Sequence, residues 1–161
     1  EDVIKTIYVK PQERLKYDSK ALDVNGISLE FLRDHGCSET DAIQQIKSFI
    51  DDNYTVPPEM IGHNLIFDVQ FLNAMFKRNG ESYLFSAYMH YHPIDTMIFM
   101  KLLKHSGVIN PRSISLINSY KYFHGHAFDD AHSSDADVLA TEKLYNKIMD
   151  FVSSRCAVEN E

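Results

Sequence analysis

The chain has 161 residues, of which 44% are hydrophobic, enough for one domain with a buried core and too few for two ordinary domains. Its formal net charge of −7 argues against binding nucleic acid through a broad basic surface, although an acidic site can attract phosphate after it has bound divalent cations. No apolar run approaches the roughly 20 residues that span a bilayer, and the N-terminus lacks the pattern of a signal peptide, so we expect a cytoplasmic protein.

The N-terminal part of the chain predicts one strand and one short helix. Residues Val3–Val9 are rich in β-branched and aromatic side chains and stop before Pro11, which is typical of a strand. After a polar loop, Ser28 has the position of an N-cap, and the following helix is expected to end near His35 and Gly36.

The next segment predicts a longer helix and a buried strand. Ser38 and Asp41 have the spacing of a capping box, and apolar residues recur behind them at helical intervals to about Asp51. The short segment Glu59–Gly62 stands where a buried strand would precede another helix.

The remaining elements are predicted to be helical. The first is marked by Phe67, Phe71 and Phe76 and ends at Asn79 and Gly80. The others are a mostly apolar helix over Asp95–Leu103, a turn-rich helix around Ile114–Tyr120, and a final helix that begins near Ser133 or Ser134 and continues to Val152.

Asn64 and Asp68 form the first candidate pair for chemistry. They are four residues apart near the start of a predicted helix, so their side chains project from the same face. Two-metal hydrolysis of a phosphodiester needs carboxylates that converge on paired cations, and Asp68 suits that role. The alternative is structural: Asn64 caps the helix and Asp68 is a solvated helix residue.

A second group of polar residues precedes the last helix. His132 lies five residues before Asp137, and an imidazole there is suited to take a proton from water near neutral pH. The alternative is again capping, because Ser134 and Asp137 also have capping-box spacing, and Asp135 and Asp137 both favour a helix start. The two interpretations are compatible.

Taken together and in order, these segments resemble the DEDDh 3′–5′ exonucleases, the family of the proofreading subunit of bacterial DNA polymerase III, RNase T and oligoribonuclease. The resemblance covers nearly the whole chain, from Val3 to about Phe151. It rests on Ala-Leu-Asp-Val-Asn-Gly-Ile-Ser at 21–28, Gly-His-Asn-Leu-Ile-Phe-Asp at 62–68, Pro-Ile-Asp-Thr at 93–96 and His-Ser-Ser-Asp-Ala-Asp at 132–137.

The resemblance implies an exonuclease that acts on single-stranded DNA or RNA 3′ ends with Mg²⁺ or Mn²⁺. Asp137 would be a direct metal ligand, Asp68 a ligand acting partly through water, and His132 the general base. The residues implied to contact the terminal nucleotide are Val24, Asn25, Asn64 and Phe67, with Asn25 standing where many members have histidine.

The chain departs from the family at its first motif, because Asp-x-Glu occurs nowhere in it. The implied fold is α/β, a ribonuclease H-like mixed central sheet flanked by helices and lacking its first two strands. We therefore expect an N-terminally incomplete exonuclease domain at 1–152 and a polar tail at 153–161, with the missing strands supplied by another chain segment or by a partner such as a polymerase. The alternative is a catalytically inactive relative that binds nucleic acid or protein.

The other histidines and the cysteines do not indicate a specific functional site. The pairs His90/His92 and His124/His126 have a spacing that suits zinc, but no third ligand is evident in the sequence, so we interpret them as surface or packed residues. The two cysteines lie far apart in the sequence and are expected to be free thiols.

Overall fold

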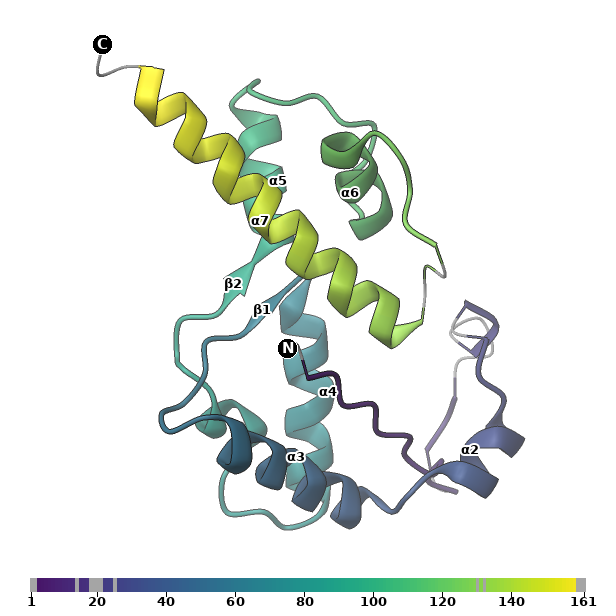
Figure 1. The fold of residues 1–161 in the computed structure, drawn as a ribbon. Coiled ribbons are helices and arrows are strands. Elements are labelled where there is room, and N and C mark those ends of the chain that lie inside the picture. Colours follow the sequence, from purple (N-terminus) through teal and green to yellow (C-terminus); the bar gives the residue numbers. More distant parts are fainter. Residues whose placement is uncertain are drawn as a thin grey trace. The chain divides into compact units, whose positions relative to one another are not determined.

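The computed structural model of the chain (Figure 1) describes residues 3–13, 15–17, 22–24, 26–129, 131 and 133–158, without the side chains of 156–158. These residues form two compact units, each with its own core. The first unit comprises Glu1–Met60 and Ile66–His92, and the second comprises Ile61–Leu65 and Pro93–Glu161.

The first unit is helical, and its helix starts follow from the sequence. Its helices are α2 (Leu29–His35), α3 (Glu39–Asn53), nearly all of α4 (Leu65–Arg78) and the short 3-10 helix η1 (Phe85–Tyr88). Ser28 caps α2, because its side chain accepts a hydrogen bond from the backbone N–H of Phe31 at 3.0 Å. Ser38 caps α3 in the same way through the N–H of Asp41 at 3.0 Å, which confirms both predicted caps.

The core of this unit lies between α3, α4 and η1. Its buried residues are Ala42, Ile43, Ile50, Met75, Phe76 and Phe85. The fully buried ring of Phe76 contacts the ring of Phe85, with centroids 5.8 Å apart, in an edge-to-face arrangement that aromatic pairs favour.

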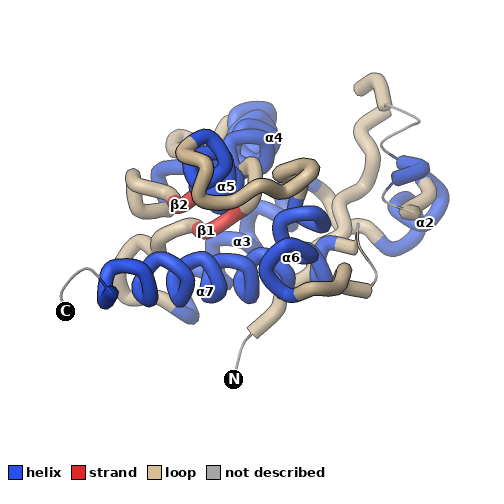
Figure 2. Tube along the Cα trace, turned by 90° about the horizontal axis from the view of Figure 1, so that it is seen from above, coloured by secondary structure: helices blue, strands red, loops and turns tan. Residues whose placement is uncertain are grey.

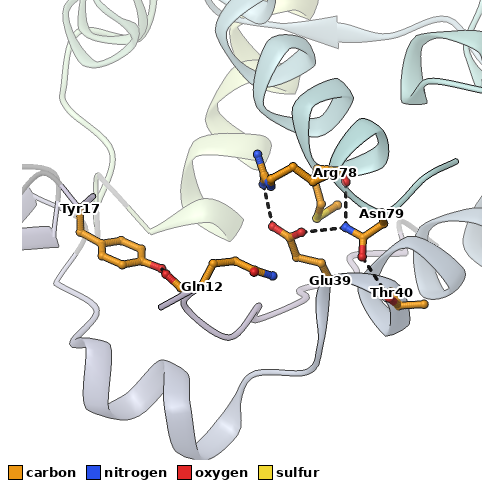
Figure 3. Close-up of polar contacts among 7 residues, drawn as sticks. Gln12, Tyr17, Glu39, Thr40, Arg78 and Asn79 are labelled. Atoms are coloured by element: carbon orange, nitrogen blue, oxygen red, sulfur yellow. Dashed lines mark hydrogen bonds and ion pairs between the residues drawn. The ribbon is translucent and has the colours of Figure 1, made fainter. Parts of the chain in front are cut away.

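One buried carboxylate ties α3 to the end of α4 (Figure 3). Glu39, which is 7% exposed, accepts a hydrogen bond from Arg78 Nη2 at 2.6 Å and another from Asn79 Nδ2 at 2.7 Å. Thr40 donates to the amide oxygen of Asn79 at 3.0 Å. The acidic group at the start of one helix and the basic group at the end of the other also suit both helix dipoles.

The predicted strand Val3–Val9 is wrong. Residues 3–8 belong to no strand, and Val9 forms only an isolated parallel bridge with Cys37. That bridge consists of Cys37 N–H donating to Tyr8 O and Lys10 N–H donating to Cys37 O, both at 2.8 Å. A strand needs a continuous partner, and here the partner is a single residue between two helices.

The second unit contains a small parallel sheet. Strand β1 (Ile61–Gly62) pairs with β2 (Ile94–Asp95), and Gly62 lies opposite Asp95 in the register (Figure 2). The predicted strand at residues 59–62 is therefore present but shorter. Over the described residues the chain is mixed α/β, mostly helical, and its one sheet is this two-stranded pair.

Three helices complete the second unit. They are α5 (Thr96–His105), α6 (Leu116–His124) and α7 (Ser134–Val158), and α7 contacts α5, α6 and β1. Their shared core contains Met100, Ile109, Leu144 and Ile148. The last helix begins as predicted but continues beyond Val152 to Val158, so the first part of the expected polar tail is helical.

No helix in the described part of the chain combines the length and the apolar character needed to cross a membrane.

Replacing Glu39 tests the polar tie in the first unit. We expect Glu39→Ala to lower the free energy of unfolding by about 1–3 kcal/mol, because Arg78 and Asn79 lose a charged acceptor. Glu30→Ala is a matched control, since Glu30 is also in the first turn of a helix but is exposed. Urea unfolding followed by circular dichroism would measure both variants, and equal effects would contradict the assigned role.

Candidate active site

The turn between β1 and α4 carries the first candidate motif, and its backbone is tightly constrained. A Cβ atom on Gly62 would lie 2.5 Å from Cδ1 of Leu65, and because that side chain is only 6% exposed, any larger residue at position 62 would force the buried Leu65 to move. Asn64 has a φ of +67° and is the one non-glycine residue with positive φ in the described part of the chain. Asparagine tolerates this left-handed conformation better than most residues.

Asp95 fixes this turn through three hydrogen bonds. Its Oδ1 accepts the backbone N–H groups of Asn64 at 3.0 Å and Met97 at 2.9 Å, and its Oδ2 accepts the N–H of Leu65 at 3.0 Å. One carboxylate therefore caps the starts of both α4 and α5. Hydrogen bonds to a charged acceptor are stronger than neutral ones, and a negative charge also suits the positive end of each helix dipole.

His63 adds a second polar link across the same junction. Its Nε2 lies 2.9 Å from the carbonyl oxygen of Ile114, and its Nδ1 lies 2.9 Å from Oγ1 of Thr96. Thr96 is fully buried, and its Oγ1 lies 2.9 Å from the carbonyl oxygen of Gly62. Because a carbonyl oxygen only accepts, Nε2 is assigned as the donor to Ile114. In the neutral imidazole Nδ1 then accepts, and the single proton of the Thr96 hydroxyl is shared between Nδ1 and the Gly62 carbonyl oxygen. The imidazole ties the end of β1 to the first residue of α5 and to the loop before α6.

Burial lowers the pKa of His63 from its ordinary value. The hydrogen bond to the Ile114 carbonyl and the negative charge of Asp95 act in the opposite direction but are smaller effects. The neutral imidazole is therefore favoured in the folded chain relative to the unfolded chain.

Two predicted site residues, Phe67 and Asp68, lie at the start of α4, shortly after this turn. Phe67 is 57% exposed, and its ring lies 4.7 Å from that of Phe71, centroid to centroid. Asp68 is exposed and belongs to the first unit. The alternative interpretation made Asn64 the cap of this helix. In the structure it is the carboxylate of Asp95 that accepts the backbone N–H of Leu65 at the start of α4.

The second candidate motif begins α7. Ser133 caps this helix, since its Oγ accepts the N–H of Ala136 at 3.3 Å and its carbonyl accepts the N–H of Asp137 at 3.0 Å. The predicted capping box named Ser134 as the cap, and the capping residue is its neighbour. Asp137 is half-buried in the first turn of α7 and belongs to the second unit.

Two predicted site residues, His132 and Asn25, lie outside the described residues. Val24 is described as part of a helical turn at 22–24 and is 54% exposed. The roles of these three residues, and of Asn64, Phe67, Asp68 and Asp137, stay predictions.

The described side chains do not by themselves complete a metal site. Across the described ranges, no group of three or more histidine, cysteine, aspartate or glutamate residues is arranged to hold a cation. Asp68 belongs to the first unit and Asp137 to the second. Mg²⁺ needs octahedral oxygen coordination, so neither carboxylate by itself holds a cation. The suggested zinc sites at His90/His92 and His124/His126 gain no support either.

Sequence reasoning did not assign Asp95 and His63 a role in holding the motif. The signal for Asp95 was present, since an aspartate directly before an apolar helical segment is a typical N-cap. Its bonds to Asn64 and Leu65 join positions about thirty residues apart in the chain, and no local pattern contains that information.

A comparison with known protein families is consistent with this arrangement. The family model described as RNase T, exonuclease, matches residues 1–145. The match includes both candidate motifs and the Asp95 junction.

The Asp95 junction leads to a stability prediction. We expect Asp95→Ala to lower the free energy of unfolding by about 2–3 kcal/mol, because two helix starts lose their acceptor. Asp95→Asn keeps one acceptor oxygen, so its free energy of unfolding should lie between those of Asp95→Ala and the wild type. Glu142→Ala removes an exposed carboxylate from the middle of α7 and serves as the control, with an expected change within about 0.5 kcal/mol. Similar losses in urea unfolding for Asp95→Ala and Glu142→Ala would contradict the role.

The lowered pKa of His63 leads to a second prediction. Because the unfolded chain binds a proton to this residue more readily, stability should rise with pH through the histidine range and fall as the pH drops below about 6.5. We expect His63→Gln to reduce this slope in unfolding free energies measured between about pH 5 and 8. His124, whose pKa is also lowered by burial, should account for part of the remaining slope. An unchanged slope in the variant would contradict the prediction.

Proposed function

Because this chain belongs to the RNase T exonuclease family, we propose that it is a metal-dependent 3′–5′ exonuclease domain that removes nucleotides from single-stranded nucleic-acid 3′ ends. The observation that carries the proposal is the family match over residues 1–145, which spans both candidate motifs in their expected order. The Asp95 and His63 contacts support it, since they hold the first motif in one defined backbone conformation.

The proposed chemistry is hydrolysis of the terminal phosphodiester, which releases a nucleoside monophosphate. His132 takes the proton from the attacking water, a role that suits an imidazole near neutral pH. Asp137 and Asp68 contribute to binding Mg²⁺ or Mn²⁺, and such cations, when bound, offset the charge of the scissile phosphate. The residues proposed to hold the terminal nucleotide are Val24, Asn25, Asn64 and Phe67.

The exposed ring of Phe67 is suited to that contact. It is more than half accessible and stands one residue before Asp68. Base stacking on an accessible aromatic ring contributes about 1–3 kcal/mol and does not depend strongly on sequence, which fits an enzyme that trims ends in succession.

The proposed fold is ribonuclease H-like, with β1 and β2 as two of its strands. Further strands and the carboxylates of an Asp-x-Glu motif would come from another chain segment or from a partner such as a polymerase. In support, the chain contains no Asp-x-Glu, and among the described residues no group of His, Cys, Asp or Glu side chains is arranged to hold a cation.

The same two observations favour a second candidate, a catalytically silent domain that retains the family's fold to bind nucleic acid or protein. The two candidates differ in one measurable property, which is whether single-stranded 3′ ends become shorter in the presence of metal.

The test uses a 5′-labelled single-stranded oligonucleotide with Mn²⁺ and the purified chain. We expect 3′ shortening that stops with EDTA and falls at least about 100-fold in Asp137→Asn, because a metal ligand supplies several kcal/mol of charge stabilisation. Asp135→Asn removes a neighbouring exposed carboxylate from the same helix turn and should stay near wild type.

The outcomes separate the candidates. If Asp137→Asn trims as fast as wild type, the assigned role of Asp137 is wrong. If the wild-type chain binds the oligonucleotide but never shortens it, the silent candidate is favoured.

A further inference from the structure

Helices α6 and α7 contact each other in the second unit (Figure 1), and a cluster of basic residues lies on and next to them. It comprises His124 at the end of α6, His126 two residues later, and Lys143 and Lys147 on α7. Lys143 and Lys147 are both exposed and are four residues apart, so they share one face of the helix. The two elements thus bring four basic side chains to one place.

The contacts of His124 show that these groups face one another. Its ring stacks on Tyr120, with centroids 4.0 Å apart, and the His126 ring lies 6.3 Å away. Burial lowers the pKa of His124, the backbone of Lys143 acts in the opposite direction, and the positive charges of Lys147, His126 and Lys143 lower it further. The cluster therefore produces a local positive potential in a chain with net charge −7.

The clustering of these basic side chains does not by itself stabilise the fold. Like charges four residues apart destabilise a helix by a few tenths of a kcal/mol. Within the described residues, the ion pairs are Lys47 with Glu81 and Arg78 with Glu39, so neither Lys143 nor Lys147 is paired with a carboxylate there. An anionic ligand would account for the cluster, because it would offset the repulsion.

We propose that Lys143, Lys147 and His126 bind phosphate groups of a single-stranded nucleic-acid backbone beside His124, whose buried Nε2 takes no part. The inference rests on the proposed function for the identity of the ligand. Its placement follows from α7, which carries both Asp137 and the two lysines. At 1.5 Å per residue, Lys143 and Lys147 lie about 9 and 15 Å along the helix axis from Asp137. At 3.6 residues per turn they are also turned about 80–120° around the axis from Asp137, so a strand whose 3′ end is held near Asp137 would cross α7 obliquely to bring upstream phosphates beside the cluster.

The chemistry favours a backbone contact over base recognition. Lysine ammonium groups act as point charges toward phosphate, and phosphate contacts fix the position of a strand without reading its sequence. The cluster should accordingly affect binding strength and its salt dependence equally for different sequences.

The test is the salt dependence of oligonucleotide binding, measured by fluorescence anisotropy in EDTA so that no trimming occurs. For the double variant Lys143→Gln/Lys147→Gln, we expect the slope of log K against log salt to become shallower by about 1.4, since each single-strand phosphate contact contributes about 0.7. The matched control is Lys77→Gln/Lys101→Gln, which removes the same charge from exposed positions on α4 and α5 and should keep the wild-type slope. Circular dichroism would check that both variants stay folded.

Three results would overturn the inference. They are an unchanged slope in the Lys143/Lys147 variant, an equal loss in the control, or no binding of the oligonucleotide together with binding of inorganic phosphate alone. Failure of the exonuclease proposal is distinguishable, because it appears as absent trimming in Mn²⁺ while the shallower slope in EDTA still supports the phosphate site. Trimming in Mn²⁺ together with an unchanged slope in EDTA would support the exonuclease proposal and contradict the phosphate site.

Discussion

The candidate site depends on one carboxylate that serves two helices. Asp95 ends β2, accepts the first N–H groups of α4, and caps α5 through Met97. The N–H groups of a helix start need acceptors, and here a single charged group supplies them for two helices. The position of Asn64 relative to β2 is therefore set by bonds whose geometry leaves little freedom. Phe67 and Asp68 follow in sequence on the first turns of α4.

The same principle appears in the first unit. Glu39 is a buried acidic residue at the start of a helix, and it accepts hydrogen bonds from Arg78 and Asn79 at the end of another. In both units a carboxylate joins segments that are distant in the sequence, and each unit has its own apolar core. A buried charge is costly without partners, so these residues favour one arrangement of their helices over others with similar apolar packing.

The acidic character of the chain and its proposed substrate are compatible because charge is distributed unevenly. A net charge of −7 repels a polyanion at long range, but contacts with phosphate depend on local potential. The basic residues of α6 and α7 provide such a potential on the helix that also carries Asp137. Cations bound with additional ligands would provide another, which makes the source of those ligands the central question about catalysis.

The sequence by itself determined the position of most helices, two of their caps and the family. Ser28 and Ser38 cap as predicted because these N-caps involve only neighbouring residues. Apolar periodicity located α3 and α4, although Phe67 and Phe71 of α4 are exposed. It failed for Val3–Val9, because β propensity describes a residue and a strand requires a partner. The contacts of Asp95 and His63 were decided only by the tertiary structure. They join residues about 30 to 50 positions apart, and such pairings arise when helices pack, so no local pattern encodes them.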